Sequence, residues 1–495
     1  MLVFDSRESA SRVARLHFVY QTESLPIRTQ TLGDPLLNIA VLAFWPLISG
    51  PLDQAEEVFL RSMLRRNLQV RVDSLELASV REAASGARSA LGPQLGLTGE
   101  VGSTFGSADR SAQQALGTAK ATQWVPTGGE LSGTLHGGRT VVESDGQSAE
   151  RDTLGAQIAF TQPLLRGFGA GSALGFADRQ AQANVAIRIQ GSRSTVLARL
   201  QESRIAFWNQ LAREQVVAAR QSDSLRTLRL LEASRVRRST GSASDLDTLQ
   251  AHAAHLEAVS GLLSARAETR SGWRDLLALS DTTALTLPVL DSGALPPVSE
   301  FPLPDSARLV ASAITRAPEL AQAIALVQKA EDEKAYRRQD RLPSLDVTGL
   351  AQSDLLEGGW ILGAKARLEW LLPNGANRSR YRQALLDLHA SEIRQVQARS
   401  ELQRQIGRLV EAVAAARAQQ EVATLLAQAQ GKRLAATEIS WNAGRSSWTE
   451  LVAARRDALE ARTGAWKALA SAKALEAELE ARTGTGPERL GWTGE

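Results

Sequence analysis

Two long stretches without proline constrain the fold of this 495-residue chain more than any other feature of its sequence. One stretch lies between Pro163 and Pro288 and holds 124 residues; the other lies between Pro373 and Pro487 and holds 113. Proline breaks the interior of an α-helix. Both stretches can therefore hold helices that are much longer than those of an ordinary globular domain.

Apolar residues in these stretches recur every three to four positions, which predicts helices. A helix from about Ser172 to Arg238 would be about 100 Å long at 1.5 Å per residue. No single globular core buries such a rod, so we expect it to pack on partner helices as in a coiled coil. The same pattern predicts further helices over about 245–279, 377–441 and 448–482, and shorter helical segments over 52–90 and 305–339.

Four other segments alternate between apolar and polar residues, which predicts β-strands. Two precede the first long helix, at about 95–105 and 154–160, and two precede the second, from 343 and from 360. Residues 106–151, between the first two strands, are rich in Gly, Ser and Thr and lack periodicity. We therefore expect a long loop there.

The order helix, two strands, long helix, shorter helix occurs twice, which indicates an internal duplication. We expect a mainly α fold with membrane β-strands, in two structural repeats. Residues 281–304 hold five prolines and predict an irregular connector. The predicted organisation is an N-terminal extension with a probable signal segment, a first repeat, the connector, a second repeat and a C-terminal tail, over residues 1–50, 51–280, 281–304, 305–483 and 484–495.

The two helix-to-helix turns match each other residue by residue. Gly241 aligns with Gly444, Ser244 with Ser447, and Asp247 with Glu450. A glycine can end one helix in the left-handed conformation, and a serine caps the start of the next. An acidic residue three positions after the cap is favoured by the helix dipole. The paired turns predict the two tips of two helical hairpins.

The segment from Trp360 to Trp370 predicts a membrane strand. Even-numbered residues here are apolar and odd-numbered residues include Lys365, Arg367 and Glu369, with tryptophan at both ends. Transmembrane strands have about 9–11 residues, alternate in this way and carry aromatic residues at both interfaces. Trp360 and Trp370 are therefore candidate membrane-interface residues, although an amphipathic edge strand of a soluble sheet would show the same alternation.

A membrane sheet must also close, because lipid does not tolerate open sheet edges. The expected four strands of one chain cannot form a barrel, since the smallest known barrels have about eight strands. Two chains would supply eight strands and three chains twelve, and twelve would leave a pore. We therefore expect several copies of the chain to share one barrel.

Composition excludes several classes of protein. The net charge of +3, from 57 basic and 54 acidic residues, does not favour a nucleic-acid partner. The absence of cysteine excludes disulfides, thiolate catalysis and a lipid anchor on an N-terminal cysteine. The one long apolar run, Leu36–Ile48, has 13 residues, as in a signal peptide, although a buried helix or strand would also fit. No catalytic residue, cofactor or metal ion is expected.

The sequence resembles the TolC-type outer-membrane efflux protein family over roughly Leu52–Thr483. The resemblance rests on the duplicated order of elements, the paired tip turns and three local motifs: the opening helix to Asn67, the segment Gln162–Gly169, and the Leu-Leu-Pro-Asn-Gly turn that ends at Gly375. Such proteins are homotrimers. Their twelve-stranded barrel in the outer membrane continues into an α-helical tunnel across the periplasm, where a periplasmic adaptor and an inner-membrane transporter meet its tips.

The resemblance also implies roles for the tip residues. Glu450 stands at a position of the family's acidic aperture ring, Asp247 at the matching position of the first repeat, and Trp441 at an aromatic gating position. Arg445 lies next to the family's gating arginine position, so an Asp247–Arg445 latch is a hypothesis; equally, both acids could be ordinary helix-start residues. The turns holding Gly241, Ser244, Gly444 and Ser447 are the expected adaptor contacts.

The resemblance implies a passive duct in the cell outer membrane, gated at its periplasmic tips. Drug efflux, metal efflux and protein secretion all remain open. Two other functions would share some features. A soluble structural coiled-coil protein would also have long helices without proline, but would not need strands bounded by tryptophan. A periplasmic adaptor has strands and a helical hairpin, but usually one hairpin and not two in tandem.

Overall fold

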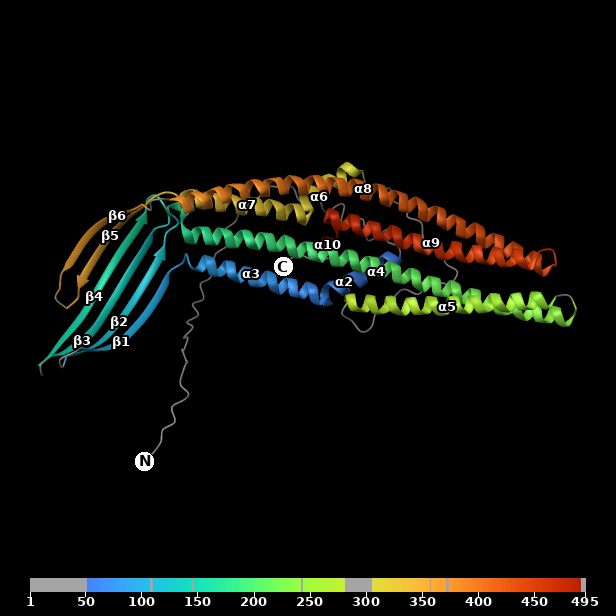
Figure 1. Cartoon of the computed structure of the whole chain (residues 1–495), viewed down its shortest axis with the longest axis horizontal. Helices are drawn as coiled ribbons and strands as arrows, with labels where there is room; N and C mark the ends of the chain where they lie inside the picture. Colours follow the sequence, from blue (N-terminus) through green and yellow to red (C-terminus); the bar gives the residue numbers. More distant parts are fainter. Residues whose placement is uncertain are drawn as a thin grey trace, which may run out of the picture. The chain divides into compact units, whose positions relative to one another are not determined.

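The structure of the protein, a computed structural model, describes residues 51–106, 110–144, 147–241, 244–280, 305–356, 358–370 and 374–490. Residues Gly50–Glu495 form one compact unit, drawn in Figure 1. The predicted signal segment Leu36–Ile48 and the predicted connector 281–304 lie outside the described residues.

Four long helices follow the predicted positions closely. They are α4 (Ala173–Ser239), α5 (Asp245–Ser280), α8 (Gly375–Asn442) and α9 (Trp448–Thr483). The two longest have 67 and 68 residues. Each repeat contains one long helix that turns at its far end into a shorter return helix, and the two hairpins lie side by side (Figure 1). The duplicated helical order is therefore confirmed.

The helical segment before each pair of predicted strands is broken once, which the sequence pattern did not show. The first consists of α2 (Pro51–Arg66) and α3 (Leu68–Ser89), and the second of α6 (Ser306–Arg316) and α7 (Pro318–Gln339). Asn67 breaks the first, because its side chain accepts hydrogen bonds from the backbone N–H groups of Gln69 and Val70 and so caps α3. Pro318 begins α7, where its missing N–H costs nothing.

The described residues contain one antiparallel sheet of six strands in the order of the sequence. Its strands are β1 (Gln94–Gly106), β2 (Arg110–Trp124), β3 (Glu130–Ser144), β4 (Gln147–Pro163), β5 (Ser344–Asp354) and β6 (Trp360–Glu369). The sheet joins the two repeats, because β4 of the first pairs with β5 of the second. It lies at the opposite end of the long helices from the hairpin turns (Figure 1).

The prediction of four strands per chain is wrong, and with it the expected contribution to a twelve-stranded barrel. Residues 106–151 were expected to form a loop, but they hold the whole of β2 and β3 and the start of β4. Their alternating residues are mostly small or hydroxylated, so the apolar signal of each strand is weak. The backbone pairing is nevertheless continuous, from Gln94↔Thr122 to Gly106↔Arg110 between β1 and β2, and over all of β3.

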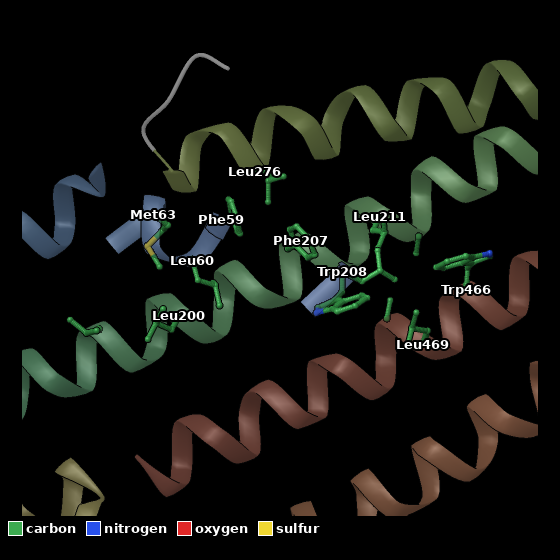
Figure 2. Close-up of a cluster of buried hydrophobic side chains, with 14 of the residues drawn as sticks. Phe59, Leu60, Met63, Leu200, Phe207, Trp208, Leu211, Leu276, Trp466 and Leu469 are labelled. Carbon is green, nitrogen blue, oxygen red and sulfur yellow. The ribbon is translucent and has the colours of Figure 1, made fainter. Parts of the chain in front are cut away.

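A cluster of buried apolar side chains holds the two repeats together at the middle of α4. Phe207 and Trp208 of α4 are 1% and 2% exposed and pack in the same cluster as Trp466 and Leu469 of α9. Phe59 of α2 stacks on Phe207 with ring centroids 5.6 Å apart. Figure 2 shows α4 running between the elements that contribute these side chains. Burial of each large side chain contributes about 1.5–3 kcal/mol, so this cluster is the main anchor between the repeats.

Buried ion pairs add specific links across the same interface. Arg204 of α4 bonds to both Glu56 of α2 and Glu480 of α9. These carboxylates raise the pKa of Arg204 above its ordinary value, although burial opposes the shift. Nearer the tips, Asp223 of α4 accepts two hydrogen bonds from Arg455 of α9, and both side chains are 6% exposed.

Candidate functional site: a sheet with one apolar face and two paired helix tips

The register of the strands places apolar side chains on one face of all six strands. The level of Leu95 in β1 continues through Ala121, Gly133, Ile158 and Ala351 to Leu362 in β6. On this face, which we call the apolar face, lie Leu95, Leu97, Val101, Ala115, Gly117, Ala119, Ala121, Leu131, Gly133, Leu135, Gly137, Leu154, Ala156, Ile158, Phe160, Leu345, Val347, Gly349, Ala351, Leu362, Ala364, Ala366 and Leu368.

The opposite face is mostly polar and we call it the polar face. The level of Lys120 continues through Thr134, Gln157 and Gln352, and the next strand places Lys365 and Arg367 on the same side. Its large apolar exceptions are Leu116, Trp124, Val142, Leu350 and Ile361. An apolar face backed by a polar one is the pattern of a barrel wall with lipid outside and water inside.

Large side chains on the apolar face are exposed in the single chain. Leu97 is 76% exposed, Ile158 55% and Leu362 79%. An apolar surface of this extent on a protein indicates contact with another apolar phase. Trp360 begins β6 and Trp370 follows its last residue, and they are 65% and 62% exposed. No helix among the described residues is long and apolar enough to cross a membrane.

The first four strands extend past the end of the β5–β6 hairpin. Residues 147–154 of β4 pair only with β3, and at about 3.4 Å per residue they add roughly 27 Å. In this extension the apolar face becomes charged, because Arg139 of β3 forms ion pairs with Glu150 and Asp152 of β4. The apolar band therefore ends near Leu154, close to the β5–β6 turn.

The strand-to-helix junction rests on the glycines of the motif Gln162–Gly169. The backbone N–H of Gly169 donates to the carbonyl oxygen of Thr127, in the β2–β3 turn, at 2.9 Å. Gly128 of this turn has φ +88°, and a Cβ atom there would lie 2.1 Å from the carbonyl oxygen of Gly167. The glycines of the motif thus leave room for the β2–β3 turn, which belongs to the hairpin that the sequence did not predict.

The two tip turns have the predicted local geometry. Gly241 and Gly444 have φ of +73° and +71°, which is the left-handed conformation that ends the long helices. Ser244 and Ser447 accept hydrogen bonds through their side chains from the backbone N–H groups of Asp247 and Glu450. The structure brings all four predicted turn residues of each tip together.

Each acidic side chain also accepts a hydrogen bond back from its capping serine, which was not predicted from the sequence. The Glu450 carboxylate accepts from the backbone N–H of Ser447 at 3.0 Å, and that of Asp247 from Ser244 at 2.9 Å. These bonds complete a capping box, whose S-x-x-E/D signature was readable in the sequence. Hydrogen bonds from the backbone and the side chain of Ser244 hold the pKa of Asp247 below its ordinary value. The capping boxes thus hold both carboxylates in place, and the lowered pKa of Asp247 keeps its carboxylate anionic at neutral pH.

The hypothetical pair Asp247–Arg445 is not formed within the described residues of one chain. Arg445 is exposed on the second tip, and the Asp247 carboxylate accepts hydrogen bonds from the backbone N–H and the hydroxyl of Ser244. The tips are instead joined by Arg237 of α4, whose guanidinium lies 3.9 Å from the centroid of the Trp441 ring. Nη2 of Arg237 also donates to the Trp441 carbonyl oxygen at 3.3 Å.

Two further contacts surround this one. Arg226 of α4 forms an ion pair with Glu438 of α8 at 2.9 Å. Trp441 is 7% exposed and belongs to an apolar cluster with Leu451, against which Leu230 of α4 packs. We call these contacts, with Arg237–Trp441, the tip contact. The predicted gating residue Trp441 therefore joins the first repeat to the second.

These features define a class of protein: a membrane-associated chain in which a sheet with one apolar face continues into two long helical hairpins. Residues 309–485, most of the second repeat, match the family model described as outer membrane efflux protein. The chain thus carries an outer membrane efflux protein domain, and the resemblance predicted from the sequence is confirmed.

Solved structures of outer-membrane proteins share the fold. The CmeC outer membrane channel of Campylobacter jejuni is 12% identical with a TM-score of 0.65, and the match covers 87% of this chain and 86% of that one. The outer membrane protein VceC of Vibrio cholerae is 12% identical with a TM-score of 0.62, over 87% and 96%. The MtrE outer membrane channel of Neisseria gonorrhoeae, in its open state, is 16% identical with a TM-score of 0.60, over 87% and 89%. No curated protein matches the sequence.

Proposed function

We propose that the chain is one subunit of a homotrimeric channel-tunnel in the bacterial outer membrane. The observation that carries the proposal is the apolar face, which extends over all six strands of a sheet that continues directly into helices of 67 and 68 residues. Lipid would cover this face, and the helices would cross the periplasm. The channel structures CmeC and MtrE support the same function.

In this proposal the protein is a passive duct and not an enzyme. Substrates enter at the helix tips from a periplasmic adaptor and an inner-membrane transporter, and leave through the barrel to the exterior. Trp360 and Trp370, exposed at the two ends of β6, lie at the two membrane interfaces. Export of small molecules and secretion of proteins would use the same path.

The experiment is purification followed by recording in planar bilayers. We expect the protein in the outer-membrane fraction, soluble only with detergent, with the mass of three chains and with single-channel conductance. Recovery from the soluble fraction without detergent would favour the alternative of a soluble coiled-coil protein. Detergent-dependent protein that never conducts would contradict the duct.

The adaptor would contact the two tip turns. A chain without cysteine permits single-cysteine variants without a background signal. Ser244→Cys and Ser447→Cys should both crosslink to the adaptor through a short bifunctional reagent, while Ser264→Cys, exposed in the middle of α5, serves as the control. Equal crosslinking at all three positions, or at the control alone, would contradict contact through the tips.

Asp247 and Glu450 would form the acidic lining of the closed aperture. Glu450→Gln separates this role from capping, because glutamine can keep the capping box while the charge is lost. We expect weaker block of the channel by multivalent cations added from the tip side, with unchanged thermal stability. Unchanged block would leave Glu450 as a capping residue only. The Asp247–Arg445 latch could still form between neighbouring subunits, and a double-cysteine crosslink would detect it.

A further inference from the structure

We propose that the β2–β3 hairpin is part of the membrane wall, so that three copies of the chain close a barrel of eighteen strands. This inference rests on the proposed homotrimer and goes beyond it, because the family resemblance implied a barrel of twelve strands. It concerns the width of the outer-membrane pore and therefore the size of solute that it admits.

The β2–β3 hairpin has the same apolar and polar faces as the rest of the sheet. On β2, Ala115, Gly117, Ala119 and Ala121 share the apolar face, while Thr118, Lys120 and Thr122 share the polar face. On β3, Leu131 and Leu135 continue the apolar face, and Thr134 and His136 the polar face. From the β2–β3 turn to the level of Gly117 and Gly137 this face carries no charge, and Arg139, opposite Ala115, begins the charged extension. A hairpin with water on both sides would not need a face free of charge over these levels.

The β2–β3 hairpin is also paired with its neighbouring strands along its length. Every residue of β3 is paired with β4, and every residue of β1 with β2. At its helix end the β2–β3 turn bonds to the strand-to-helix junction: Thr127 donates to Oε1 of Gln162 at 2.8 Å and accepts from Gly169. The hairpin is therefore held at the base of the wall and is not an appendage of its outer rim.

The width of the sheet can be compared with the width of the helical layer next to it. Strands 4.8 Å apart and tilted by about 40° each occupy roughly 6 Å of a barrel's circumference. Six strands then span about 38 Å, but four only about 25 Å. The helices next to the sheet pack in the order α3, α4, α7, α8, and four helices at about 8–10 Å spacing span roughly 32–40 Å. At this tilt, six strands match the width of the helical layer more closely than four.

A second copy of this chain pairs with each open edge of the sheet. β1 and β6 each leave one backbone edge without a partner among the described strands, and lipid does not tolerate this. Another copy offers the complementary edge, with the apolar and polar faces already in phase. Three copies give a barrel about 36 Å across between backbones, against about 24 Å for twelve strands, since diameter grows with strand number. Solutes too large for a twelve-stranded lumen would pass.

Cysteine labelling tests the position of the hairpin in the membrane. Thr118→Cys and His136→Cys on the polar face should react with a charged, membrane-impermeant maleimide in outer-membrane vesicles. Ala119→Cys and Leu135→Cys on the apolar face should be protected there and become reactive after denaturation. Equal reaction on both faces would overturn the proposal, because it would place the hairpin in water. The labelling does not depend on conduction, so it can fail while the proposed duct stands.

Deletion of the hairpin tests the strand number. Gly106 and Gln147 lie at the same level of the sheet, so removal of residues 110–144 leaves β1 next to β4 with the correct antiparallel direction and faces. Electron microscopy of the intact trimer should show a barrel about 36 Å across, and the deletion variant, if it assembles, about 24 Å. An intact trimer with a barrel near 24 Å, or a dimer, would refute eighteen strands.

Discussion

The tip contact predicts that Arg237→Ala opens the periplasmic end of the tunnel. The substitution removes the guanidinium 3.9 Å from the Trp441 ring centroid and its hydrogen bond of 3.3 Å to the Trp441 carbonyl oxygen. A cation–π contact contributes about 0.5–2 kcal/mol. Because Arg237 is half-exposed, we take about 1–2 kcal/mol for both interactions together. At 1.4 kcal/mol per factor of ten, the open state should gain about 5- to 30-fold per chain.

The assay is single-channel recording in planar bilayers, where the open probability of Arg237→Ala should rise and that of Arg237→Lys should rise less. Arg238→Ala is the matched control. It removes the same charge one residue away, but Arg238 pairs with Asp245 in its own hairpin at 2.5 Å and does not reach the second repeat. If Arg237→Ala and Arg238→Ala give the wild-type open probability, the tip contact does not hold the gate. If both raise it equally, charge and not the contact is responsible.

Three further predictions concern the sheet and the helical interface. In the proposed barrel, Ala364→Arg places a charge midway along β6 on the apolar face and should cost about 2–4 kcal/mol of barrel stability. Gly363→Arg on the polar face should leave the heat resistance of the assembly unchanged, and equal loss would contradict the assigned faces. Asp223→Ala leaves Arg455 buried without its partner and should lower the free energy of unfolding in urea by about 3–5 kcal/mol, and a loss below 1 kcal/mol would be inconsistent with the buried pair. The pKa of Glu476 is lowered, since two neighbouring cations outweigh the opposing effect of burial. Its contribution is therefore present above the unfolded pKa near 4.5 and lost as pH falls, so Glu476→Gln should be less stable than wild type at pH 7 but converge with it at acid pH; a constant difference would refute this linkage.

The long helices could be predicted from the sequence because their signals are local. Absence of proline, three-and-four spacing and the Gly-x-x-Ser turns fixed α4, α5, α8 and α9 to within a few residues. The breaks at Asn67 and Pro318 were also local signals, an asparagine cap and a proline at the first helical position. The two breaks were not predicted because apolar periodicity continues on both sides of each one.

The β2–β3 hairpin was missed for a physical reason. On β2 its apolar face is built from Ala115, Gly117, Ala119 and Ala121, which have little hydrophobicity and low strand propensity. Each strand of a membrane barrel carries a weak signal, and the wall is stabilised by pairing along its whole length. Only the pairing with β1 and β4 distinguishes this segment from a Gly- and Ser-rich loop.

The tip contact could not have been found from one sequence. Arg237 and Trp441 are 204 residues apart, and their contact depends on how the two hairpins pack. The capping boxes at Asp247 and Glu450, by contrast, lie within three residues and were readable. The sequence thus located the tips, and the structure identifies which side chains link them.

Opening of the tunnel should involve only the last part of the hairpins. Phe207 and Trp208 anchor α4 to α9 in the large apolar cluster, and Asp223–Arg455 is a second buried link nearer the tips. Only the 16 residues of α4 beyond Asp223, about 24 Å of helix, can separate from the second repeat without breaking these buried links. This segment carries the tip contact, in which the cation–π interaction and the partly exposed ion pair Arg226–Glu438 accompany the packing of Leu230 on the cluster that contains Trp441. In the proposed channel, the large apolar cluster and the Asp223–Arg455 pair would therefore hold the tunnel wall, and the tip contact would lie where substrate enters.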